Sequence, residues 1–186
     1  ERHSNRGIGR LHFGARSLAI IGAGLWRPGL PEIWRKPACI INLCKTTSPI
    51  QPRKGHCVAF IFQKGGCRPG KSLVRCGRGA VLDVAVDLRK GSPTYKKWVA
   101  VELSAENKRQ LLIPRGFGHG FVTLTDDVEF LYKEDNLYNP STDRNILWND
   151  PELGIDWRVE NPILSEKDRT APLLRDSDVD FVYEEK

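Results

Sequence analysis

The chain has 186 residues, of which 28% are charged, and a formal net charge of +6. This length is enough for one domain with a real core and too short for two domains of ordinary size. The longest strongly apolar run, residues 18–25, is too short to span a bilayer, and it lacks the layout of a signal peptide. We therefore expect a soluble, cytoplasmic protein without a membrane partner.

The charge is divided unevenly along the chain. Residues 1–80 carry 15 Lys and Arg against two acidic residues, whereas residues 81–186 carry 14 against 21. Such a split can indicate a nucleic-acid or membrane patch, or two parts of different origin. The interleaved aromatic and basic residues of a known nucleic-acid module are missing. We do not expect nucleic acid as a partner, but a non-catalytic nucleotide-sugar or nucleic-acid binding module stays open as the alternative function.

Residues 14–68 show almost no hydrophobic period. They contain two Trp, five Pro, nine basic residues and one acidic residue, and only "CVAFIF" could be a strand. We expect an atypical, poorly packed insert at about 14–68, either a damaged reading frame or a genuine insertion that covers a site. The five cysteines lack the paired C-x2-C spacing of a zinc site, so no metal is expected.

From residue 80 onward the pattern is clear. Short alternating segments, separated by turn signals, predict successive strands of an all-β sandwich or barrel. Near the C-terminus, Ser165 could cap a short helix that has acidic residues in its first turn. The predicted strands are "AVLDVAVDL" from residue 80, "WVAVELS", "NKRQLLIP", "GHGFVTLT" and "VEFLYKED".

Three long stretches carry a family resemblance. "GAVLDVAVDLRKGSPTYKKWVAVELSAENKRQLLIPRGFGHGF", "EFLYKEDNLYNPSTDRNILWNDPELGIDW" and "PILSEKDR" closely resemble the dTDP-4-dehydrorhamnose 3,5-epimerases, with a shorter match in "HSNRGIGRLHF". The resemblance implies one cupin-like jelly-roll domain over residues 1–186, with short C-terminal helices and an N-terminal part incomplete relative to the family. It also implies a homodimer that uses no metal or organic cofactor.

The reaction implied by the resemblance converts dTDP-4-dehydro-6-deoxy-D-glucose to dTDP-4-dehydro-L-rhamnose, in dTDP-rhamnose biosynthesis. The C4 ketone acidifies the hydrogens on C3 and C5, so inversion needs a base on one face of the sugar and an acid on the other. By resemblance, His12 is the base, Asp168 orients its imidazole, and Tyr132 is the acid. We expect these three side chains to meet at one pocket mouth.

The resemblance also assigns substrate-binding residues. His119 and Arg10 would hold the diphosphate, Tyr138 would stack on thymine, and Lys71 would lie near the ketone. Further contacts fall to Asp143 and Lys167. The family's arginine lies three residues before the histidine, whereas Arg10 lies two before His12. We therefore expect weak or absent turnover in this chain, and a related 3- or 5-epimerase remains an alternative.

Overall fold

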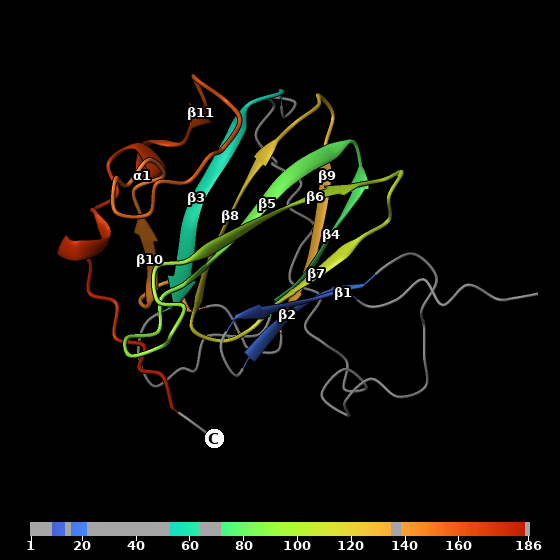
Figure 1. Ribbon diagram of the computed structural model, residues 1–186. Helices are drawn as coiled ribbons and strands as arrows, with labels where there is room; N and C mark the ends of the chain where they lie inside the picture. The colour runs from blue at the N-terminus through green and yellow to red at the C-terminus, as the bar shows by residue number, and fades with distance from the viewer. Residues whose placement is uncertain (1–8, 14–15, 22–52, 64–71, 135–138, 185–186) are drawn as a thin grey trace, which may run out of the picture.

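The computed structural model describes residues 9–13, 16–21, 53–63, 72–134 and 139–184, which form two facing β-sheets and one short α-helix (Figure 1). Sheet A has the strand order β1-β2-β7-β4-β9, and sheet B has the order β10-β3-β8-β5-β6 with β11 paired to β3. Among the described residues, no helix is long and apolar enough to cross a membrane. This architecture is a cupin-like jelly roll, as expected.

The elements follow one another closely along the described parts of the chain. Sheet A contains β1 (Gly9–Phe13), β2 (Arg16–Ile21), β4 (Ser72–Arg78), β7 (Gln110–Ile113) and β9 (Glu129–Glu134). Sheet B contains β3 (His56–Gln63), β5 (Ala80–Asp87), β6 (Trp98–Ser104), β8 (Phe117–Thr123), β10 (Asp143–Ile146) and β11 (Ile163–Leu164). The helix α1 (Glu166–Arg169) and the 3-10 helix η2 (Leu174–Asp176) follow. All five strands predicted from residue 80 onward are confirmed.

Sheet B is covered on both faces. One face packs against sheet A through an apolar cluster that includes Val74, Val81, Leu111, Phe117 and Phe130. The other face is covered by the C-terminal segment, the orange and red part of the chain in Figure 1, in a second cluster. That cluster includes Phe60, Leu82, Val84, Val122, Ile146, Trp157 and Phe181. Because both faces are covered, every residue of β5 after Ala80 is buried, including the two acidic residues.

Two parts of the segment expected to be an insert form strands, residues 16–21 as β2 and residues 56–63 as β3, the latter containing the possible strand "CVAFIF". Residues 56–63 form β3, which lies between β10 and β8 in sheet B. Phe60 and Phe62 are both buried in the cluster under the C-terminal segment. The centres of the Phe60 and Trp157 rings lie 5.3 Å apart. Burial of two aromatic side chains stabilises this strand whatever the composition of the residues before it. Residues 22–52 and 64–71 lie outside the described part.

A buried ion pair fixes the end of β5 to the C-terminal segment. Arg89 donates to Asp87 at 2.6 and 2.8 Å, and both side chains are almost fully buried. The Arg89 guanidinium also lies over the rings of Phe117 and Tyr183, at 4.8 and 5.2 Å from their centres. Ser92 and Thr94 donate two further hydrogen bonds to Asp87. This network therefore joins the end of β5 to the C-terminal segment at Tyr183.

The helix cap predicted at Ser165 is confirmed. The Ser165 hydroxyl accepts a hydrogen bond from the backbone N–H of Asp168, and Glu166 and Asp168 lie in the first turn. The cap therefore fixes the position of Asp168 within a helix of one turn.

Candidate active site

A histidine–carboxylate pair lies on the face of sheet B that looks toward sheet A. His119 on β8 and Asp83 on β5 come from neighbouring strands, and His119 Nε2 lies 2.9 Å from Asp83 Oδ2. The Asp83 side chain is fully buried, whereas 22% of the His119 side chain is exposed. The imidazole therefore pairs with a buried carboxylate on one side and is partly accessible to solvent.

Burial opposes a positive charge on His119, but the charge and hydrogen bond of Asp83, with the charge of Glu134, outweigh it and raise the pKa of the imidazole. A raised pKa keeps the ring cationic to higher pH than a free histidine. A partly exposed cation of this kind is suited to an anionic group such as a diphosphate.

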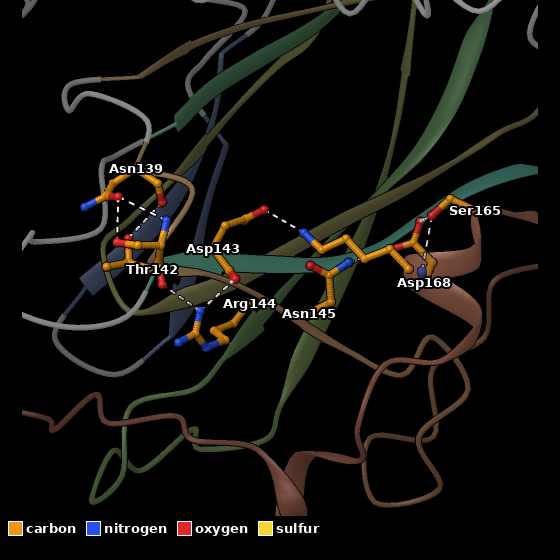
Figure 2. A network of polar contacts seen from close by, with 9 residues as sticks. Asn139, Thr142, Asp143, Arg144, Asn145, Ser165 and Asp168 are labelled. Atoms are coloured by element: carbon orange, nitrogen blue, oxygen red, sulfur yellow. Dashed lines mark hydrogen bonds and ion pairs between the residues drawn. The ribbon is translucent and has the colours of Figure 1, made fainter.

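A second polar network surrounds Asp168 (Figure 2). Its carboxylate is buried, and it accepts hydrogen bonds from Asn145 Nδ2 at 2.8 Å and from the Ser165 hydroxyl at 2.7 Å. Burial, then the negative charge of Asp168, raise the pKa of the nearby Cys57 thiol to about 12. The thiol therefore stays neutral near pH 7, and it cannot act as a base there.

Asp143 and Lys167 are brought together at the edge of sheet B. Lys167 Nζ lies 2.6 Å from Asp143 Oδ2, and the lysine side chain is 55% exposed while the aspartate is mostly buried. Asp143 stands two residues before Asn145 on β10, so both side chains lie on one face of the strand. The two polar networks are therefore neighbours.

Tyr132 faces the histidine from the opposite sheet. On β9 it stands between Phe130 and Glu134, and alternation places all three on one face. The Phe130 ring lies 6.2 Å from the His119 ring, and the charge of Glu134 acts on His119. Tyr132 packs against the cluster between the sheets. Tyr132 therefore lies between Phe130 and Glu134 on this face of the strand, and both of those residues interact with His119.

The strand register of sheet B lines up the residues opposite Tyr132. Asn145 on β10 pairs with Ile61 on β3, and Ile61 pairs with His119 on β8. Directly paired residues of antiparallel strands project their side chains to the same face. Asn145, Ile61 and His119 therefore form one row on the wall that faces sheet A. Ile61 is an exception to the packing around it, because 39% of this large apolar residue is exposed.

The backbone does not bring His12 to this row. His12 lies on β1 at the edge of sheet A, and β2, β7 and β4 stand between β1 and the Tyr132 strand. Four strand spacings amount to roughly 19 Å. Asp168, its predicted partner, is instead bonded to Asn145 and Ser165 beside sheet B. In the described part of the chain β1 pairs with β2, so this arrangement does not support a meeting of His12, Asp168 and Tyr132, which stays a prediction.

The other predicted residues divide into two groups. Arg10 lies on β1 opposite Ala19, away from the His119 row along sheet A. Lys71 and Tyr138 lie outside the described residues. Sequence reasoning missed Asp83, Asn145 and Ile61. Asp83 had a signal, since it is an acidic residue inside a strand that is otherwise apolar on both sides.

The comparisons with known proteins agree with this fold. The sequence profile of the dTDP-4-dehydrorhamnose 3,5-epimerase family matches residues 53–176, which include β3 and all the residues of the row. The match begins inside the segment expected to be an insert. The chain therefore belongs to the dTDP-4-dehydrorhamnose 3,5-epimerase family.

Individual relatives support the same family. A dTDP-4-dehydrorhamnose 3,5-epimerase of Salmonella typhimurium is 60% identical over 114 residues, which cover 61% of this chain and 62% of that protein. One from Sinorhizobium fredii is 44% identical over 82% of this chain and 78% of its own length. The crystal structure of RmlC from Legionella pneumophila, in complex with dTDP-4-keto-L-rhamnose, has a TM-score of 0.74 at 32% identity, over 90% of this chain and 94% of that one. The chain spans about three fifths of the length of several curated relatives.

Proposed function

We propose that this chain carries the sugar-nucleotide site of a dTDP-4-dehydrorhamnose 3,5-epimerase, whose reaction is epimerisation at C3 and C5 of dTDP-4-dehydro-6-deoxy-D-glucose. The observation that carries the proposal is the placement of His119 and Tyr132 on opposite sheets, facing the same space, in a chain of this family. His119, whose imidazole pKa is raised by Asp83, would hold the diphosphate, and the Tyr132 hydroxyl would serve as proton donor to the sugar.

The remaining polar groups have places in this proposal. Asp143 and Lys167 lie at the edge of sheet B, where a sugar or nucleotide would reach their ion pair. Asp168 would supply a fixed, buried negative charge beside the sugar site. Epimerisation leaves the oxidation state of the sugar unchanged, so proton transfers suffice for the chemistry. The proposal also includes a homodimer in the cytoplasm, which the family resemblance implies.

Binding of dTDP tests the proposal directly. Isothermal titration of the chain with dTDP should give saturable binding, and His119→Gln should weaken it at least tenfold at pH 7. Lys54→Met is the matched control, because Lys54 is an exposed cation just before β3, and its hydrogen bond to Asp126 is donated by the backbone N–H, which methionine keeps. Equal loss with both variants, or a salt dependence as steep as that of nonspecific phosphate contacts, would contradict the proposed site.

A further inference from the structure

In the row formed by Asn145, Ile61 and His119, the middle residue is apolar although both of its paired neighbours are polar. Ile61 stands between Asn145 and His119, with Tyr132 on the facing sheet, and 39% of it is exposed. Two of the three neighbours of Ile61 are polar groups already engaged with buried carboxylates, Asn145 with Asp168 and His119 with Asp83. A large apolar side chain gains only part of its burial energy at such a position, since 39% of it remains exposed beside polar neighbours.

A second observation at the same position points to a missing hydrogen-bond donor. Asn145 donates its amide N–H to Asp168, and its amide oxygen is buried with no hydrogen-bond partner among the described residues. Buried polar atoms in folded proteins almost always have a partner. The side chain that lies directly across the ladder from Asn145 is Ile61, which has no donor to offer. A donor at residue 61 would complete a chain of bonds that runs back to the Asp168 carboxylate.

Resting on the proposed function, we infer that residue 61 is the position of the proton-accepting side chain, and that with Ile61 there the chain binds a dTDP-sugar without removing a proton from C3 or C5. The geometry has three parts. Asp168, the carboxylate that would orient a base, is one side chain away through Asn145. His119, the anion-binding group, is paired with residue 61. Tyr132, the donor, faces this row from sheet A.

The other candidate bases among the described residues do not occupy this position. His56 begins β3, and five residues of extended chain separate it from Ile61, roughly 17 Å. His12 lies at the far edge of sheet A. The Cys57 thiol is buried and neutral. His119 faces the site, but its Nε2 is already paired with the Asp83 carboxylate 2.9 Å away, so that nitrogen is not free to accept a proton from the sugar.

The step that Ile61 cannot perform is defined by its bonds. A base nitrogen takes the hydrogen from C3 or C5 as a proton, and the C–H electron pair forms the C=C bond of an enolate whose charge rests on the C4 oxygen. The Tyr132 hydroxyl then gives its proton to the opposite face of the same carbon, and the enolate electrons form the new C–H bond. The proton on the base returns to the tyrosinate through solvent, so the cycle needs no other reagent.

Ile61→His is the test. The parent chain and the variant are incubated with dTDP-4-dehydro-6-deoxy-D-glucose in D2O, and deuterium at C3 and C5 is followed by NMR. The parent should exchange at the rate of buffer alone. Ile61→His should raise exchange by about 100-fold or more, the usual contribution of a positioned general base. Ile163→His, which changes another exposed isoleucine on β11, is the matched control and should give no gain.

A second readout distinguishes a base from a merely structural change. The pKa of the introduced imidazole, measured by NMR without substrate, should fall when Asp168→Asn is added to Ile61→His, and deuterium exchange should fall with it. If Ile61→His does not fold, Ile61→Ala with free imidazole in solution replaces it, and exchange should rise and saturate with imidazole concentration.

Three outcomes would overturn the inference. Exchange by the parent chain well above buffer would show that a base is already present, and its loss in His119→Gln at a substrate concentration that saturates the variant would assign that base to His119. Absence of any gain from Ile61→His or from added imidazole, while dTDP still binds, would show that residue 61 is not the base position. Failure of the parent to bind dTDP would instead count against the proposed function, so the two failures are distinguishable.

Discussion

His119 Nε2 lies 2.9 Å from Asp83 Oδ2, and the two side chains come from adjacent central strands of sheet B. The aspartate is fully buried and the histidine partly exposed. Asp83 therefore raises the pKa of an imidazole that faces the space between the sheets.

The first prediction concerns the charge of this pair. Asp83→Asn removes the carboxylate that raises the His119 pKa, so the His119 pKa should fall and burial should then dominate. In the parent, the raised pKa contributes stability that is fully present below the unfolded histidine pKa and is lost as pH rises through the folded pKa. NMR titration of His119 and unfolding between pH 5 and 8 would measure both. Unchanged His119 titration in Asp83→Asn would contradict this account.

The second prediction concerns the buried pair of Asp87 and Arg89. Arg89→Met leaves the Asp87 carboxylate buried without its ion pair, which should cost about 3–5 kcal/mol of unfolding free energy. The control is Arg78→Met, since Arg78 and Asp127 form an exposed pair worth about 0–1 kcal/mol. Urea unfolding of both variants measures the difference. Equal losses would show that the network around Asp87 does not hold the C-terminal segment.

The hydrogen bonds around Asp87 should also determine the acid pH at which the fold loses stability. Burial alone would raise the pKa of Asp87, but hydrogen bonds from Arg89, Ser92 and Thr94 outweigh it and lower the pKa below its usual value. The resulting stability is present above the unfolded aspartate pKa and is lost as pH falls through the lowered folded pKa. Thr94→Val should move this acid transition to higher pH, as followed by circular dichroism. A transition at the same pH would leave Thr94 without a role in the network.

The third prediction tests β3. Phe60→Ala should cost about 3–5 kcal/mol, because Phe60 is fully buried against Trp157. Ile61→Ala changes the next residue, which points to the other face and is partly exposed, so its cost should be much smaller. Denaturant unfolding separates the two. Similar small losses would mean that residues 56–63 are not part of the sheet.

The fourth prediction separates backbone strain from crowding at two glycines. Gly91 and Gly116 have φ values of +84° and +86°, but a Cβ at Gly91 would meet no atom within 4 Å, whereas one at Gly116 would lie 2.6 Å from Arg89 Cγ. Gly91→Ala should therefore cost about 1–2 kcal/mol for the left-handed backbone alone. Gly116→Ala should cost measurably more in thermal unfolding. If the two alanine variants lost the same stability, Arg89 would be adapting freely.

Local pattern was enough for the later strands and for the Ser165 cap. The alternation from residue 80 onward follows the pleat, and a serine before acidic residues is a local signal. The local sequence pattern could not reveal that Asp83 and Asp87 are buried. Their burial depends on the C-terminal segment and sheet A, which cover the two faces of β5. Burial of an acidic strand residue is a property of the whole fold.

The site could be predicted only in part for the same reason. Tyr132 and His119 were identified together, and the structure places them on facing walls. The base was assigned to His12 from a short motif, "LHF". Such a motif does not determine which strand the segment pairs with in the sheet. The position opposite Asn145 is fixed by register across three strands that are distant in sequence, and it is occupied by a residue from the least regular part of the chain.

The place of β3 in sheet B has a consequence for synthesis on the ribosome. Its two neighbours are β8 and β10, at residues 117–123 and 143–146, and β11 completes its edge at residues 163–164. An aromatic-rich strand with unpaired edges must therefore wait until most of the chain has emerged before it can enter a sheet. During that delay "HCVAFIFQ" offers its backbone to any other nascent strand. Yield in cells should consequently depend on chaperone supply more than on the final stability of the folded sandwich.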